Sequence, residues 1–209
     1  MVFQGKEQFI DQCIDMVKFR VAWWFKHHAK GSTDPISLIL LDVGDRCRDS
    51  NPRKKRMSAR WKLPSLDCLK FNVDGSAKGS PGPAGMGGVL RDSYGKVICL
   101  FFSFLGIFDG ISAEIEEIHK ACVLCLSNCD LRNRCISIVS DSKTAMDWIN
   151  EADQICVSHP TLIQVIRFLL SSLSNTTVSY SSRSSNSFAD LLAKKASSMG
   201  GDFVQWGDT

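Results

Sequence analysis

The chain contains the stretch DGSAKGSPGPAG, residues 74–85, directly after an alternating segment that ends at Val73. Leu69, Phe71 and Val73 alternate with polar residues, as in a strand that buries one face. The glycines and prolines of the stretch predict tight turns rather than ordinary sheet. Asp74 is therefore expected at the end of a strand, where its carboxylate can serve as a ligand for a hard metal ion.

Three acidic residues further along the chain are expected at similar exposed ends of elements. Glu114 falls in the first turn of a predicted helix, Asp141 at the end of a predicted strand, and Asp190 in the first turn of the last helix. Taken singly, each is explained as a turn, cap or helix-dipole residue. Four carboxylates in a small volume repel one another unless a cation is present. Together with Asp74 they predict a metal site for hydrolysis of nucleic acid.

Composition indicates a globular protein with one domain and an extension. The chain has 209 residues, of which 44% are hydrophobic and 22% charged. Its longest apolar run, residues 97–102, is far shorter than the ~20 residues that a membrane span needs. The first residues lack the pattern of a signal peptide. We therefore expect an intracellular protein, nuclear or cytoplasmic, that is not secreted and has no membrane partner.

The chain has nine cysteines, an odd number, at irregular spacing. This pattern predicts reduced thiols rather than a disulfide framework. Cys122, Cys125 and Cys129 recur at helical spacing on an apolar face. A zinc site there would need a fourth ligand, for which His119 is the candidate. Core packing is the favoured interpretation, because free cysteine behaves as a small hydrophobic residue.

Charge is divided unevenly along the chain. Residues 1–70 carry 14 Lys and Arg against 8 Asp and Glu, a net of +6, whereas residues 71–209 carry 11 against 14, a net of −3. A basic arm joined to an acidic body is expected if the arm helps to hold an anionic polymer. The basic run at residues 53–56 is read as a solvated linker, with nucleic-acid contact or nuclear targeting as alternatives.

The periodicity of the apolar residues predicts a helical and basic extension with a linker over residues 1–60, a domain over 61–200 and a tail over 201–209. The extension contains a helix over residues 7–29. In the domain, strands are expected at 69–74, 87–91, 97–105, 135–140 and 176–180, and helices from 112 (with Ser112 as cap), over 141–150, from 160 and over 188–199. This order predicts an α/β fold with a mixed five-stranded sheet, three antiparallel strands and then two parallel ones, flanked by helices.

The same segments resemble type 1 ribonuclease H, and more narrowly the reverse-transcriptase-like ribonuclease H domains common in plants. The resemblance covers residues 61–200, and it rests on residues 74–91, Ala113-Glu114, residues 140–142 and residues 186–193. Residues 7–60 are similar to the segment that precedes this domain in plant non-LTR retrotransposon polyproteins.

The resemblance implies a ribonuclease H-like fold and endonucleolytic hydrolysis of the RNA strand of an RNA–DNA hybrid. It implies two Mg²⁺ or Mn²⁺ ions, with a catalytic and metal-binding set made of Asp74, Glu114, Asp141 and Asp190. Implied contacts to the substrate are at Gly75, Ser76, Ala77, Gly79, Ser80, Lys143 and Asn186. The partner would be a hybrid or another nucleic acid, and RNA would be recognised by its 2′-hydroxyl groups.

The chain departs from the family pattern at several positions. Tyr180 stands ten residues before Asp190, where the family usually has a histidine that assists proton transfer. A phenol with a pKa of ~10 is a poor proton shuttle near neutrality, so Tyr180 is an auxiliary candidate and slower turnover is expected. Gly110 and Ile111 replace asparagines, and asparagine is also frequent at Ser80, which predicts weaker 2′-hydroxyl recognition. There are two alternatives to an active ribonuclease. One is a catalytically weak or silent nucleic-acid-binding relic of a retrotransposon, and the other is a partner-docking module.

Overall fold

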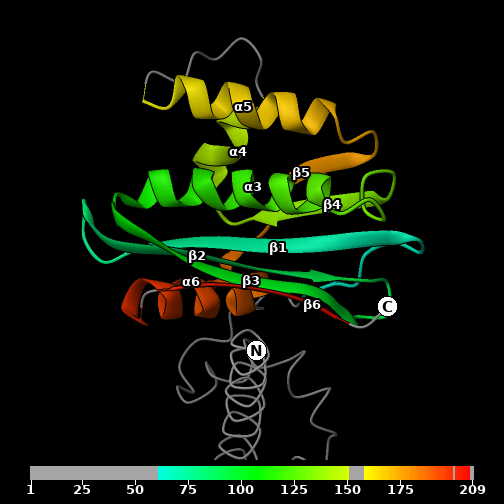
Figure 1. Ribbon diagram of the computed structural model, residues 1–209, viewed down its shortest axis with the longest axis horizontal. Coiled ribbons are helices and arrows are strands. Elements are labelled where there is room, and N and C mark those ends of the chain that lie inside the picture. Colours follow the sequence, from blue (N-terminus) through cyan, green and yellow to red (C-terminus); the bar gives the residue numbers. More distant parts are fainter. Residues whose placement is uncertain (1–60, 151–157, 200, 208–209) are drawn as a thin grey trace, which may run out of the picture. The chain divides into compact units, whose positions relative to one another are not determined.

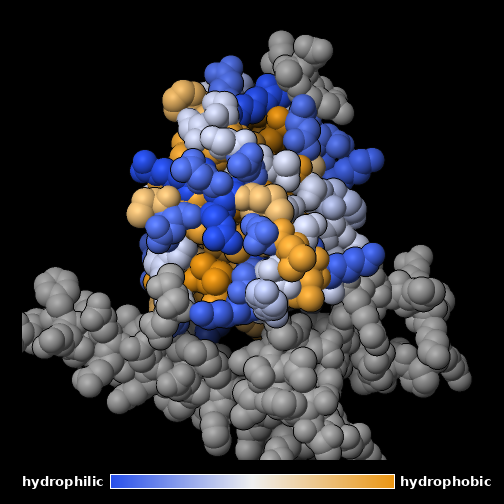
Figure 2. Space-filling model, turned by 90° about the vertical axis from the view of Figure 1, so that its right-hand side faces the viewer, coloured by the Kyte–Doolittle hydropathy of each residue, from blue (hydrophilic) through white to orange (hydrophobic). Residues whose placement is uncertain are grey.

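The computed structural model describes residues 61–150, 158–199 and 201–207 (Figure 1). The helix predicted over residues 7–29 and the basic run at 53–56 lie outside these ranges. On the face drawn in Figure 2, hydrophilic side chains surround smaller groups of hydrophobic ones, as is usual for a globular domain.

A mixed sheet forms the centre of the domain. Its strands are β1 (Cys68–Ala77), β2 (Gly82–Arg91), β3 (Val97–Phe108), β4 (Cys135–Ser140), β5 (Thr176–Tyr180) and β6 (Asp202–Trp206), in the order β5-β4-β1-β2-β3-β6. The first three strands are antiparallel neighbours, whereas β4 lies parallel to β1 and β5 parallel to β4. The predicted α/β fold with three antiparallel and two parallel strands is confirmed.

The sixth strand is an addition to the prediction. Residues 201–209 were expected as a tail, but β6 pairs antiparallel with β3 along its length. Phe203 stacks on Phe102 of β3 with ring centroids 5.3 Å apart. Gly201, with a positive φ of 93°, provides the turn that leads from the last helix into β6.

Helices cover both faces of the sheet. They are α3 (Gly110–Ser127), α4 (Lys143–Asn150), α5 (Pro160–Ser171) and α6 (Ser187–Met199), with a 3-10 turn η1 (Arg183–Ser185) before the last. Figure 1 shows α3, α4 and α5 on one side and α6 on the other. Among the described helices, none combines the length and the apolar character needed to cross a bilayer.

The main core lies between the sheet and α3. Phe71 of β1 is buried and packs edge-to-face against Phe101 of β3, with ring centroids 5.7 Å apart. Cys122 and Cys125 are also buried there, which confirms their core role. Cys129 is exposed because α3 ends at Ser127, so its predicted place on the buried face is wrong.

The glycine-rich stretch lies mostly in strands, which corrects the turn prediction. β1 continues to Ala77, so Asp74 lies inside this strand and not at its end as expected, and β2 already begins at Gly82. A Cβ atom on Gly85 would lie 2.4 Å from the backbone N of Ser197, and one on Gly87 2.4 Å from Cβ of Leu192. The glycines of β2 therefore allow α6 to lie directly on the strand.

Two cysteines form a disulfide, so the expectation of reduced thiols is wrong for this pair. Cys68 of β1 is bonded to Cys135 of β4. The two residues are also opposite each other in the parallel pairing of these strands. The bond links β1 and β4 at the residues where both strands begin, away from Asp74 and Asp141.

Helix α3 begins earlier than predicted. Asp109 is its N-cap and accepts a hydrogen bond from the backbone N of Ser112 at 2.8 Å, whereas Ser112 itself was expected as the cap. A short carboxylate is a good acceptor for the free N–H groups of a first turn. Because the helix starts at Gly110, Glu114 lies in its second turn and not in its first.

Candidate active site

Two of the predicted acids meet where β1 and β4 run side by side. The parallel pairing places Asn72 opposite Val139, and two residues beyond each lie Asp74 and Asp141. The two acids lie close enough for the charge of Asp141 to contribute to the raised pKa of Asp74. The prediction that the later strand docks beside the first and brings Asp74 to Asp141 is confirmed.

Asp74 is a buried acid of the site with a strongly raised pKa. Its side chain is 2% exposed, and burial, followed by repulsion from Asp141 and Asp190, raises its pKa to about 9. Its Oδ2 atom is buried and has no hydrogen-bond partner among the described residues. A buried carboxyl oxygen without a partner is costly, and a bound cation would remove that cost.

Glu114 reaches the site because α3 approaches β1 unusually closely. A Cβ atom on Gly75 would lie 2.5 Å from the carbonyl carbon of Ala113, so only glycine permits this contact. The Ser142 hydroxyl donates a short hydrogen bond to Glu114 Oε2. Burial raises the pKa of Glu114, with a further contribution from Asp141.

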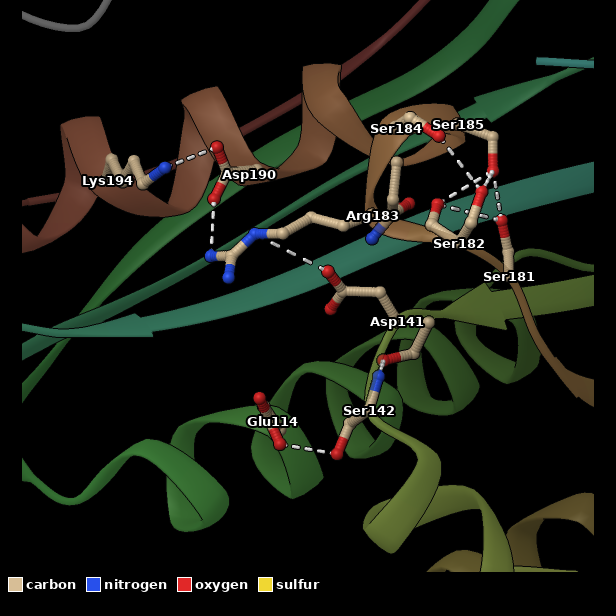
Figure 3. A network of polar contacts seen from close by, with 12 residues as sticks. Glu114, Asp141, Ser142, Ser181, Ser182, Arg183, Ser184, Ser185, Asp190 and Lys194 are labelled. Carbon is tan, nitrogen blue, oxygen red and sulfur yellow. Dashed lines mark hydrogen bonds and ion pairs between the residues drawn. The ribbon is translucent and has the colours of Figure 1, made fainter. Parts of the chain in front are cut away.

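Asp190 approaches the other acids from the opposite face of the sheet, on α6. Arg183 lies between it and Asp141, with Nη2 3.3 Å from Asp190 Oδ1 and Nε 3.8 Å from Asp141 Oδ2 (Figure 3). Lys194 pairs with Asp190 at 2.5 Å. The hydrogen bond from Arg183 to Asp190 raises the pKa of the guanidinium. In this arrangement two of the four acids are neutralised by side chains of the protein itself.

Asn186, expected at the substrate, uses its amide inside the protein. It is 1% exposed, donates to the backbone O of Val73 at 2.7 Å and accepts from Asn72 at 3.1 Å. Asn72 in turn accepts from the indole of Trp61 at 2.8 Å. The backbone O of Asn186 accepts from the N–H of Asp190 at 3.1 Å. Asn186 therefore fixes the turn that presents Asp190.

The other predicted substrate residues lie around the β1–β2 turn and at the start of α4. Ser76 and Ala77 are partly exposed in β1, and Gly75 packs against α3. Exposed positions are Gly79, Ser80 and Lys143. Lys78 donates to Ser198 of α6 at 2.6 Å, which ties the β1–β2 turn to that helix. Contact between the predicted substrate residues and a nucleic acid stays a prediction.

Tyr180 lies at the end of β5, opposite Ser140 in the pairing of β4 and β5. Its side chain is 56% exposed. Its position beside the residue that precedes Asp141 puts it at the border of the site. The auxiliary role stays a prediction.

Sequence reasoning missed several residues that the structure joins to the acids. Arg183 lies in a serine-rich run without periodicity, which gives no signal of its contacts. Ser140 and Ser142 directly flank Asp141, and this adjacency was the available clue. Glu117, three residues after Glu114, shares its helix face and is fully buried.

The four acids interact with one another but do not form a preformed metal cage. Within the ranges that the structure describes, no group of three or more His, Cys, Asp or Glu side chains is arranged to hold a metal ion. Arg183 lies between Asp141 and Asp190 and contacts both carboxylates. The donor set nevertheless fits a hard divalent cation, because it consists of carboxylate oxygens and includes the unpartnered Oδ2 of Asp74.

Comparisons with known proteins identify the family and the fold of the chain. The family described as reverse transcriptase-like matches residues 72–196. An Arabidopsis thaliana protein that carries the name "Putative ribonuclease H protein" is 31% identical over 108 residues, which are 52% of this chain and 16% of that protein. The chain thus spans a small part of this relative's length.

Solved structures share the fold. RNase H1 from Halobacterium salinarum superposes with a TM-score of 0.56 at 23% identity, over 62% of this chain and 96% of that one. LC11-RNase H1, isolated from compost, was solved in complex with an RNA/DNA hybrid and gives 0.53 at 23% identity, over 61% and 94%. The foamy viral protease-reverse transcriptase, also solved with a hybrid, gives 0.56 at 20%, over 71% and 22%. The chain belongs to the reverse transcriptase-like family and has the ribonuclease H fold.

Proposed function

We propose that this protein is a ribonuclease that hydrolyses the RNA strand of RNA–DNA hybrids endonucleolytically. The observation that carries the proposal is the arrangement of three acids around Asp141. Asp74 lies on the neighbouring strand, Glu114 is hydrogen-bonded to Ser142, and Asp190 shares Arg183 with Asp141. The pKa of Asp74 is raised by both Asp141 and Asp190, and that of Glu114 by Asp141, so the acids feel one another's charge. Family membership and two neighbours solved with hybrids support the substrate class.

The four acids would hold divalent cations, Mg²⁺ or Mn²⁺. A pair of such cations, when bound, activates a water molecule and stabilises the leaving oxygen of a phosphoryl displacement. The chain's own residues prepare the site: Ser142 orients Glu114, and Asn186 fixes the turn before Asp190. Asp74 has to release its proton before it can act as a ligand, because its pKa is about 9 in the metal-free protein.

For Asp141 and Asp190 to hold a cation, Arg183 would have to move away from both carboxylates. In the metal-free protein its guanidinium is the counter-charge for both carboxylates. The side chain is 62% exposed, so it can move into solvent without crossing packed core. The exposed turn at Gly79 and Ser80, with Lys143, offers the adjoining surface for the hybrid, where 2′-hydroxyl contacts would distinguish RNA from DNA.

The decisive experiment is cleavage of an end-labelled RNA–DNA hybrid with Mg²⁺ or Mn²⁺. We expect cutting of the RNA strand by the wild type and loss of at least ~100-fold in Asp74→Asn, because an amide cannot replace an ionised ligand. Asp202→Asn, which changes an exposed acid of β6, is the matched control and should cut normally. Equal cutting by Asp74→Asn and the control would exclude the proposed site.

A second candidate function is hybrid binding without cleavage. It is favoured by the ion pairs that Arg183 and Lys194 make with Asp190, because they neutralise a proposed ligand. Retention of hybrids in a gel-shift assay, without cutting in either metal, would support this candidate.

A further inference from the structure

Glu117 is a buried acid for which the proposed reaction has no role. It lies on α3 one turn beyond Glu114, and its side chain is 0% exposed. Its neighbours on the helix, Ile115 and Ile118, are core residues. Burial of a carboxyl group is costly unless it is hydrogen-bonded, so its contacts indicate what it does.

The contacts of Glu117 lead to the segment that carries Asp141. Ser140 donates a hydrogen bond from Oγ to Glu117 Oε1 at 2.5 Å. The same hydroxyl accepts from the backbone N of Ser142 at 3.2 Å. Ser142 in turn donates from its own hydroxyl to Glu114. The two serines that flank Asp141 are thus each bonded to a carboxyl group of α3.

We propose that Glu117 is a positioning residue that holds Ser140, Asp141 and Ser142 against α3 and so fixes Asp141 relative to Glu114. Without the bond from Ser140 to Glu117, this segment would keep only the bond from Ser142 to Glu114, on the C-terminal side of Asp141. The inference rests on the proposed function, because the value of fixing these two acids is a shared cation.

A direct role as a metal ligand is the competing interpretation. Glu117 Oε2 has no hydrogen-bond partner among the residues described. Among the other acids, Asp74 contributes most to the raised pKa of Glu117. Burial raises the pKa of Glu117 well above its usual range, which favours the neutral carboxyl group when no metal is bound. A neutral carboxyl oxygen can still accept the hydrogen bond from Ser140. Glutamine can accept the same bond from Ser140, whereas it is a poor cation ligand. The two interpretations therefore differ in what Glu117→Gln does.

The test compares Glu117→Gln, Glu117→Ala and the matched control Glu116→Gln, which changes the neighbouring, partly exposed acid. The first readout is hydrogen exchange of the amides at 140–142 without metal, and the second is Mn²⁺ affinity by calorimetry. In Glu117→Ala we expect both exchange to rise and affinity to fall by roughly tenfold, the scale of one lost hydrogen bond in a buried site. In Glu117→Gln both should stay within about threefold of wild type, and in the control both should be unchanged.

Ser140→Ala removes the same bond from the other partner and covers the case in which Glu117→Ala does not fold. It should reproduce the faster exchange and the weaker Mn²⁺ binding. Equal loss of Mn²⁺ affinity in Glu117→Gln and Glu117→Ala would overturn the positioning role and make Glu117 a ligand. Unchanged exchange in Glu117→Ala and Ser140→Ala would overturn the inference while the metal site stands. Faster exchange in the variants, with no Mn²⁺ binding by the wild type, would overturn the proposed metal site and with it the positioning role.

Discussion

Arg183 Nη2 lies 3.3 Å from Asp190 Oδ1, so a proposed metal ligand is paired with a cation of the protein itself. The same guanidinium approaches Asp141 at 3.8 Å. Under the proposed function, Arg183 and a divalent cation would compete for the same two carboxylates. In the metal-free protein the guanidinium offsets part of the repulsion among these acids.

Removing Arg183 should strengthen metal binding. In the wild type, a bound cation would replace the ion pairs of Arg183 with Asp141 and Asp190, which are worth well under 1 kcal/mol each. We therefore expect Arg183→Gln, which lacks these ion pairs, to bind Mn²⁺ about threefold more tightly than the wild type. Calorimetric titration measures the change. Arg134→Gln, which removes an exposed arginine elsewhere, is the control and should bind as the wild type does. Weaker binding in Arg183→Gln would show that the guanidinium supports the metal-bound state instead.

The metal-free protein should lose stability as pH rises. The pKa of Asp74 is about 9 in the folded protein and about 4 in an unfolded chain, so between these values only the folded state holds the proton. Its contribution to stability is complete below about pH 4 and is lost as pH rises toward 9. Thermal unfolding in a chelator at pH 5 and pH 8 tests this expectation.

Asp74→Asn is the comparison for that pH series. The amide stays neutral throughout, so the fall in melting temperature from pH 5 to pH 8 should be smaller than in the wild type. A residual slope is expected, because burial also raises the pKa of Glu114 and Glu117. Identical slopes in the wild type and in Asp74→Asn would contradict the buried, protonated state of Asp74.

Gly87→Ala should destabilise the domain. The added Cβ would lie 2.4 Å from Cβ of Leu192 and 2.7 Å from the backbone N of Ala193, so α6 would have to shift. Overpacking of this kind costs about 1–3 kcal/mol. Gly110→Ala is the matched control, since its Cβ would meet nothing within 4 Å. Urea denaturation should separate the two variants, and similar midpoints would mean that α6 does not press on β2.

Reduction of the Cys68–Cys135 disulfide should lower stability. The bond spans 67 residues of sequence, and closing a loop of that size is worth roughly 4 kcal/mol in the chain-entropy model. Cys68→Ser should show the same loss without reductant. Cys129→Ser removes an exposed free thiol and serves as control. A midpoint that does not respond to dithiothreitol would mean that the two thiols are not bonded in solution.

The sequence was sufficient where local pattern decides structure. The alternation before Asp74 and the short strand before Asp141 predicted two strands, and their parallel pairing brought those acids together as expected. Partners distant in sequence left no comparable signal. Cys68 and Cys135 become neighbours only after β4 has docked beside β1. Glu116 and Glu117 are chemically alike, and only the packing of α3 buries the second.

The pairing of β6 with β3 has a consequence for any shortened form of this protein. Removal of the residues after Gly200 would leave the backbone groups of β3 without the strand that now covers them, and would leave Phe102 without its stacking partner Phe203. An exposed hydrophobic edge strand can pair through its free backbone groups with the edge strand of a second molecule. Such a form should therefore self-associate at concentrations where the longer chain stays monodisperse.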